Sequence, residues 1–198
     1  MNRISNVARP ALGVRPLERS DIGQMQSWQR HTDPLFVPYN VPVLSGDQEE
    51  TFWRYWTEKP ATISLAGLVE GRLIAHILLR DHDPVSGSAD LGISLDPGFI
   101  GQGLGTGLLR LTRDFAYKTL GIERITLDVA AWNKRAIRAY VKAGFIETGR
   151  RWIDWDTPID FRTLLEGPGN EWLWEHVRID TGYTIVLVRM CAQKTRSI

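Results

Sequence analysis

The chain has 198 residues, of which 43% are hydrophobic and 24% are charged, and its formal net charge is +1. This balance gives no electrostatic reason to expect binding to nucleic acid or to an anionic membrane surface. No apolar run approaches the ~20 residues of a membrane span, and the N-terminus lacks the apolar stretch of a leader. Cys191 is the only cysteine, and the four histidines lack paired ligand spacing. We therefore expect one cytoplasmic domain over residues 1–198, without a disulfide or a metal site.

The first part of the chain predicts strands and helices in alternation. Ser20 is a good N-cap, and three prolines keep residues 31–44 out of regular structure. The expected elements are a strand Leu12–Leu17, a helix Asp21–Gln29, a helix from Ser45 or Asp47 to about Lys59, and two strands, Thr62–Val69 and Arg72–Arg80, joined at Glu70-Gly71.

Residues 81–88 are polar and predict a loop. A strand follows at Asp90–Leu95, and then glycine occupies every second position at Gly101, Gly103, Gly105 and Gly107. A helix is expected over Thr106–Leu120, with Leu108, Leu111 and Phe115 on its buried face and Gly121 as its end.

The glycine-rich stretch has the chemistry of a phosphate cradle. Glycine accepts positive φ and leaves room for a ligand, so successive N–H groups can converge on an anion at the start of the helix. The spacing fits neither a P-loop, which needs a Lys-Ser/Thr pair, nor the G-x-G-x-x-G of a dinucleotide fold, since Thr106 or Leu108 stands at the last position. Both of these readings are therefore disfavoured, and a flexible glycine-rich loop without a ligand is a further alternative.

The remaining elements complete an α/β pattern. Arg124–Ala130 alternates as a strand, and Asn133 is a good N-cap for a helix Lys134–Ala143 that stops at Gly144. Further strands are expected at Phe145–Arg150 and Tyr183–Met190. Helices alternate with strands in the centre and hairpins lie toward the ends, which predicts an α/β class with a mixed sheet.

Two motifs resemble those of the GCN5-related N-acetyltransferase (GNAT) family. Leu95-Asp96-Pro97 followed by Ile100-Gly101-Gln102-Gly103-Leu104-Gly105 resembles the family's strand end and pyrophosphate loop, although Ile100 replaces the usual Arg or Gln. Asn133-x-x-Ala136-x-x-x-Tyr140, followed by Lys142-Ala143-Gly144-Phe145, resembles its second motif. The likeness is strong over residues 89–151, and its character is that of bacterial acetyltransferases acting on ribosomal-protein alanine or polyamines.

The resemblance implies a fold, a donor and a set of roles. The fold would be a mixed, mostly antiparallel sheet flanked by helices, with two splayed parallel strands, and the donor would be acetyl-CoA. Tyr140 would be the general acid for the departing thiolate, and Asp90 is a candidate base, with Asp96 or a water chain as alternatives. The expected cofactor-binding residues are Ser94, Leu95, Gly101, Gln102, Gly103, Leu104, Gly105, Thr106, Asn133 and Ala136.

Residues 152–182 have no counterpart in this resemblance. The segment carries four tryptophans and seven acidic residues, with a Gly167-Pro168-Gly169 turn. It could be a packed insertion, a subunit contact in a homodimer, or a lid whose acids attract a cationic amine.

The expected activity is transfer of an acetyl group from acetyl-CoA to a primary amine, by direct attack in a ternary complex. The amine could be a protein N-terminus, a polyamine or an aminoglycoside-like molecule. Two alternatives remain open: a non-catalytic acyl-CoA-binding sensor of the same fold, and a nucleotide-dependent oxidoreductase, which the glycine spacing disfavours.

Overall fold

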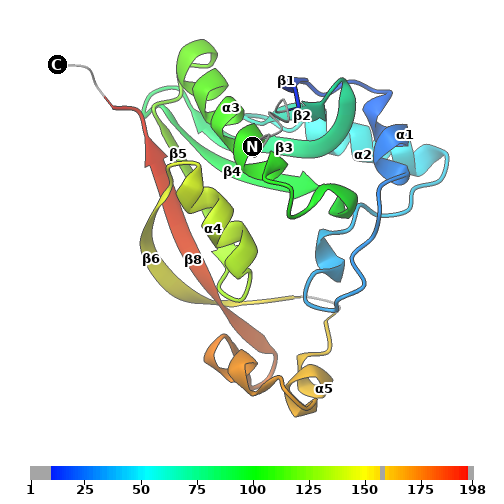
Figure 1. Cartoon of the computed structure of the whole chain (residues 1–198), viewed down its shortest axis with the longest axis vertical. Coiled ribbons are helices and arrows are strands. Elements are labelled where there is room, and N and C mark those ends of the chain that lie inside the picture. The colour runs from blue at the N-terminus through cyan, green and yellow to red at the C-terminus, as the bar shows by residue number, and fades with distance from the viewer. Residues whose placement is uncertain (1–9, 157–158, 196–198) are drawn as a thin grey trace, which may run out of the picture.

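The computed structural model describes residues 10–156 and 159–195, and these residues fold around one eight-stranded sheet (Figure 1). The strand order is β1-β2-β3-β4-β5-β8-β6, with β7 beside β8. The strands are β1 Leu12–Pro16, β2 Ile63–Val69, β3 Arg72–Asp83, β4 Ser88–Leu95, β5 Arg124–Ala130, β6 Ile146–Asp154, β7 Val177–Ile179 and β8 Tyr183–Gln193. The helices are α1 Asp21–Gln26, α2 Asp47–Thr57, α3 Leu104–Thr119, α4 Lys134–Lys142 and α5 Phe161–Glu166.

The sheet opens in its middle. All strand pairs are antiparallel except β4 with β5, which run parallel and pair only from Ser88–Asp90 to Arg124–Thr126. Beyond that point β4 continues beside β3, and β5 continues beside β8. The expected fold class, a mixed and mostly antiparallel sheet with two splayed parallel strands, is therefore confirmed.

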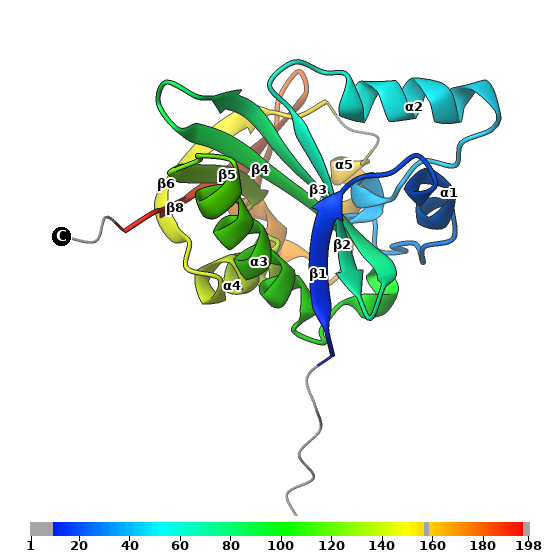
Figure 2. The same cartoon turned by 90° about the horizontal axis from the view of Figure 1, so that it is seen from above.

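Helices cover both faces of the sheet (Figure 2). On one face α3 and α4 pack against the apolar residues of β2 to β5 and β8, including Ile77, Ile125 and Val188. On the other face α1 and α2 cover β2 and β3 with a smaller core around Ile22 and Met25. The two parallel strands, β4 and β5, separate next to the core that lies between the sheet and helices α3 and α4.

The first two helices are shorter than expected at one or both ends. α1 ends at Gln26 because the Ser27 hydroxyl donates to the Gln24 carbonyl and the chain then turns toward Asp96, whose carboxylate accepts from the Gln29 N–H. Ser20 is the N-cap by position, but its side chain makes no capping hydrogen bond. The N-cap of α2 is Gly46, with a φ of 41°, rather than Ser45 or Asp47.

The loop predicted over residues 81–88 is only half loop, because strands enter it from both ends. β3 runs to Asp83 and β4 begins at Ser88, with a register shift between Arg80 and Asp83. Backbone pairing at the solvent-exposed end of a hairpin does not need apolar side chains, and the bulge accommodates the polar run. Residues 84–87 form the turn.

Helix α3 starts two residues before the expected Thr106. Its buried face also differs, because Leu111 is exposed while Leu109 and Thr112 are buried with Leu108. The buried face follows the i, i+4 row Leu104, Leu108, Thr112 and Ala116, and Leu111 lies beside this row rather than on it.

Residues 152–182 supply both sheet and a satellite core. β6 extends to Asp154 and β7 joins β8, while α5 and a 3-10 helix, Glu171–Glu175, follow the sheet's lower end (Figure 1). Phe161, Leu165 and Leu173 are buried against β8 and against Leu35 of the proline-rich loop. Packing is thus present, but Trp152, Trp172 and Trp174 remain exposed. Residues 157 and 158 of this segment lie outside the described residues, as do residues 1–9, where a leader was considered.

Across the described ranges, no helix combines the length and the apolar character needed to cross a membrane. The same residues hold no cluster of three or more His, Cys, Asp or Glu side chains arranged to bind a metal ion.

Candidate active site

A cavity of about 750 Å³ opens where β4 and β5 separate. Its walls come from the end of β4, the start of α3, one face of α4 and the loop before α2. Nine of the expected site residues line it, namely Ser94, Leu95, Gly101, Gly103, Gly105, Thr106, Asn133, Ala136 and Tyr140. The structure therefore brings both motifs together around one space.

The start of α3 presents free backbone donors at this cavity. The first bond of the helix runs from the Gly107 N–H to the Gly103 carbonyl. No hydrogen bond joins the N–H groups of Leu104, Gly105 and Thr106 to the described part of the chain. These donors and the positive end of a 16-residue helix favour an anion.

The glycines of this stretch serve different purposes. Gly101 and Gly103 have φ values of 85° and 78°, a conformation that an L side chain rarely adopts. Gly107 instead lies against β1, where an added Cβ would overlap the Leu12 side chain. Gly101 and Gly103 therefore shape the turn that leads into α3, while Gly107 serves packing.

Two expected residues of the loop do not line the cavity. The Gln102 amide turns back to donate to the Gly98 carbonyl at 3.1 Å. The Leu104 side chain is buried in the core beneath α3. If they contribute to the cradle, they do so through their backbone N–H groups.

The end of β4 is held firmly in place. Ser94 pairs with His76 of β3, and the next turn is fixed by the buried Asp96 carboxylate. Asp96 accepts from the Gly98 N–H at 2.9 Å and from the Gln29 N–H at 3.1 Å. Asp96 thus caps a turn, which occupies the carboxylate considered as an alternative base.

Helix α4 aims its motif residues at the same space. Asn133 Oδ1 accepts from the Ala136 N–H at 3.1 Å, which is the expected N-cap. Tyr140 lies two turns later, 9% exposed, with its ring against Phe145. Burial, and to a lesser extent the nearby Tyr39, raises the pKa of the Tyr140 phenol. The phenol is therefore protonated throughout the neutral range.

Three cations follow the cavity side of α4. Arg135, Arg138 and Lys142 are exposed, line the cavity and recur at i, i+3 and i+7, which puts them in one row. Arg138 has no hydrogen bond or ion pair with the described residues. This row was missed in the sequence, although its helical spacing was visible there.

Asp90 lies away from the cavity. It stands where β4 and β5 still pair, opposite Thr126, and is not among the described residues that line the cavity. Its carboxylate makes ion pairs of 3.1 Å with both Arg80 and Arg189. The same network continues to Asp128, which accepts from Arg189 and Arg151 at 2.8 and 2.7 Å. This arrangement gives Asp90 two cationic partners and no access to the space beside Tyr140.

Residues 31–39 supply the cavity wall opposite the start of α3. His31, Phe36 and Tyr39 line the cavity, and Arg135 stands over the Phe36 ring. Burial lowers the pKa of His31, Arg135 lowers it further and Asp33 acts in the opposite direction. Trp155, from the insertion, lines the cavity as well. The role of His31 could not be read from its sequence context, because no motif surrounds it.

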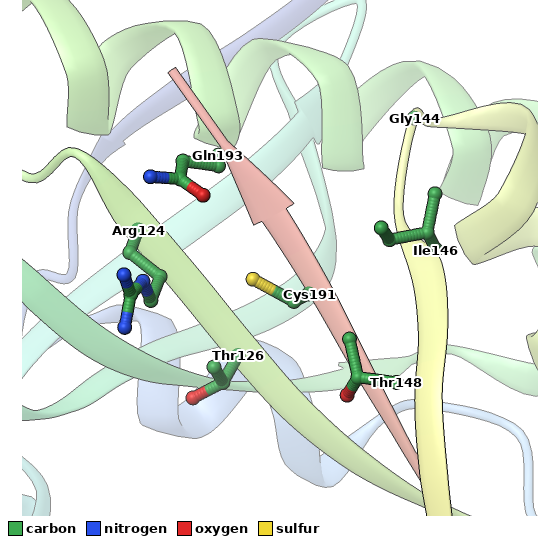
Figure 3. Close-up of a pocket in the computed structure, with 7 residues that line it drawn as sticks. All are labelled: Arg124, Thr126, Gly144, Ile146, Thr148, Cys191 and Gln193. Atoms are coloured by element: carbon green, nitrogen blue, oxygen red, sulfur yellow. The ribbon is translucent and has the colours of Figure 1, made fainter. Parts of the chain in front are cut away.

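A second hollow lies on the sheet face turned away from α3 and α4. This groove of about 530 Å³ crosses β5, β8 and β6, and includes Thr126, Thr148 and Cys191 (Figure 3). None of the expected site residues lines it.

Known proteins resemble this chain in sequence and in fold. A family model described as an acetyltransferase (GNAT) domain matches residues 11–146. A spermidine N(1)-acetyltransferase of Vibrio cholerae is 26% identical over 147 residues, covering 70% of this chain and 80% of that protein. A Bacillus subtilis protein named as a ribosomal N-acetyltransferase, YdaF, is 28% identical over 145 residues, covering 69% of this chain and 79% of that protein. The crystal structure of Vibrio cholerae spermidine N-acetyltransferase with CoA and spermine superposes with a TM-score of 0.67 at 21% identity, over 92% of this chain and 95% of the other.

Proposed function

The chain belongs to the acetyltransferase (GNAT) family and is an N-acetyltransferase with acetyl-CoA as its donor, and from this premise we propose that its acceptor is a cationic amine of the polyamine class. The relatives named as spermidine acetyltransferases support this acceptor. So does the acidic segment 152–182, because Asp154 and Asp156 flank Trp155 at the cavity wall. The observation that supports this function most directly is that the free N–H groups of α3 and the Tyr140 side chain line one cavity between two diverging strands.

Donor binding begins at the phosphates. The free N–H groups at the start of α3 would bind the pyrophosphate of acetyl-CoA, with Gly101 and Gly103 providing the backbone geometry. Arg138 and Lys142 would supply the side-chain charge that Ile100, in place of Arg or Gln, does not. Asn133 and Ala136, at the first turn of α4, would contact the pantetheine arm.

The acetyl group would then lie beside the unpaired end of β4. Residues 91–95 have no partner in β5, so backbone groups near Ser94 and Leu95 are open to the thioester carbonyl. A backbone N–H aimed at the developing oxyanion stabilises the tetrahedral intermediate. Tyr140 would give its proton to the CoA thiolate as the C–S bond breaks, and its protonated state suits that role.

Asp90 has a different role in this proposal. Because two arginines already neutralise its carboxylate, we assign it to holding β3, β4 and β8 together rather than to accepting a proton.

A thiol-release assay with acetyl-CoA tests the function. Spermidine and spermine should release CoA, and each should yield a monoacetylated product by mass spectrometry. Release of CoA with a peptide that carries a ribosomal-protein N-terminus, but not with polyamines, would show that the acceptor is a protein N-terminus instead of a polyamine. CoA binding without release for any amine would replace the enzyme with a non-catalytic acyl-CoA-binding module.

A homodimer in the cytoplasm is part of the proposal. The lone Cys191 suits a reducing compartment. β6 pairs only with β8 among the described strands, and it exposes Ile146 and Trp152 along its length. Such an edge can pair with a second copy of itself. The proposed domain covers the whole chain, with residues 152–182 as an integral part. Light scattering after gel filtration gives the subunit count.

A further inference from the structure

Acetylation of an amine needs a group that takes a proton from the incoming ammonium. A primary ammonium has a pKa of about 10, so at neutral pH almost none is free to attack. Among the described residues that line the cavity, three have side chains of the types that serve as general bases: His31, His76 and Asp128. The structure distinguishes among them.

Asp128 is already committed to its neighbours. Its Oδ2 accepts from both Arg189 and Arg151, and its Oδ1 is shielded from solvent and has no partner in the described chain. One oxygen of this carboxylate is therefore occupied by two guanidinium groups, and the other is out of reach of solvent.

His76 is too deeply buried to take a charge. It is 2% exposed, its Nε2 lies 2.7 Å from the Ser64 hydroxyl, and its ring packs 3.9 Å from that of Trp56. Burial lowers the pKa of His76 to about 3. Moving a proton from an ammonium to such an imidazole is therefore strongly unfavourable.

His31 meets the requirements that the other two fail. It is only partly buried, and it lines the cavity that Ser94 and Tyr140 also line. Its backbone is fixed by Asn40, which accepts from the His31 N–H at 2.7 Å and donates to the His31 carbonyl at 3.1 Å. Its ring lies 5.7 Å from that of Phe36. Arg135 from α4 and Asp33 from its own loop are the charged groups that act on it.

We propose that His31 is the general base of the reaction, an assignment that rests on the N-acetyltransferase function proposed above. The ammonium gives one proton to the imidazole and the free amine attacks the thioester carbon. As the C–S bond breaks, Tyr140 protonates the thiolate. The second proton of the amine nitrogen restores the phenol, and the imidazolium releases its proton to solvent. The reaction thus yields the amide, CoA thiol and one proton.

The test is the pH dependence of kcat/KM for His31→Gln with acetyl-CoA and an amine that the wild type acetylates. The variant should lose about 10²- to 10³-fold near pH 7, within the range of general base catalysis. The variant can use only amine that is already deprotonated, so its log kcat/KM should rise by about one per pH unit. The difference in kcat/KM between variant and wild type should therefore narrow toward pH 10. Imidazole should restore part of the activity of His31→Ala.

Matched controls separate a base from a structural residue. His82→Gln, at the exposed end of β3 and outside the cavity, should match wild type. Equal loss at every pH for His31→Gln, or wild-type activity, would overturn the assignment. So would the predicted pH profile appearing in His76→Gln instead. An inactive wild type that fails with every amine would instead reject the proposed function, and CoA-induced thermal shifts show that each variant is folded.

Discussion

At the scale of single residues, the candidate site uses burial to keep its side chains in one protonation state. Tyr140 is almost completely buried, so its phenol resists ionisation and can act only as a proton donor near neutral pH. His76, on the strand beside Ser94, resists protonation for the same reason. Burial therefore suits Tyr140 to act as an acid and prevents His76 from acting as a base.

Replacing Tyr140 with Phe removes the proton donor but leaves the ring and its contact with Phe145. We expect kcat to fall by about 10²- to 10⁴-fold, while the affinity for acetyl-CoA changes little. Stopped-flow thiol release and calorimetric titration with CoA measure the two quantities separately. Unchanged turnover with every accepted amine would remove Tyr140 from the mechanism.

His76 makes stability depend on pH. Its folded pKa is about 3 and the ordinary value is 6.5, so the unfolded chain binds more protons between these limits. The His76 contribution is complete above pH 6.5 and is lost as the pH falls toward 3. Urea unfolding of wild type and His76→Gln should therefore give free energies whose difference shrinks by about 1.4 kcal/mol per pH unit below pH 6. Parallel curves would contradict this prediction.

At the scale of elements, α3 and α4 face the cavity in different ways, and the proposal divides donor binding between them. α3 contributes backbone donors at its first turn, and α4 contributes side chains along one row. The position of α3 depends on its contact with β1, where Gly107 meets Leu12. The first turn can point at the cavity only while that contact stays close.

Gly107→Ala tests this packing. Alanine normally stabilises a helix by about 1 kcal/mol over glycine, but here the overlap with Leu12 should outweigh the gain and destabilise by about 1–3 kcal/mol. The double variant Leu12→Ala/Gly107→Ala should recover stability relative to the sum of the single changes. Additive losses in urea unfolding would show that the two side chains do not meet.

Arg138→Ala tests the row on α4. We expect the KM for acetyl-CoA to rise about tenfold, while the KM for acetyl-pantetheine, which lacks the phosphates, stays the same. Lys118→Ala, at the exposed far end of α3, is the control. An equal rise for both donors would mean that Arg138 acts on the protein rather than on a phosphate.

At the scale of the whole molecule, the sequence was informative where backbone geometry carries the chemistry. The strand and helix order predicted the mixed sheet, and the family resemblance carried by the glycines and Asn133 implied its two splayed strands. The sequence was uninformative where partners come from distant strands. Asp90 was a candidate base, but its partner Arg189 lies on β8, and only the strand register brings the two together. The satellite core of residues 152–182 is likewise made by contacts with Leu35, far away in sequence.

Phe161→Ala tests the connection between this satellite core and the site. Phe161 is fully buried between Trp132 and Tyr183, so its removal should cost about 3–5 kcal/mol, felt mostly within the satellite core. Hydrogen exchange should rise over residues 159–180, and the KM for the amine should rise more than the KM for acetyl-CoA. Trp174→Ala, whose side chain is exposed, should change neither.

The buried carboxylate of Asp96 has a consequence for how such an enzyme can diversify. By binding the N–H of Gln29 and the N–H of Gly98 together, it fastens the stretch leading to His31 to the turn that precedes the phosphate loop. Substitutions in that stretch are therefore constrained, because they must not disturb the turn that leads into α3. Residues 152–182 meet the same stretch through apolar contacts, which tolerate change more readily. New amine preferences would then arise by remodelling residues 152–182 while the stretch fastened by Asp96 stays fixed.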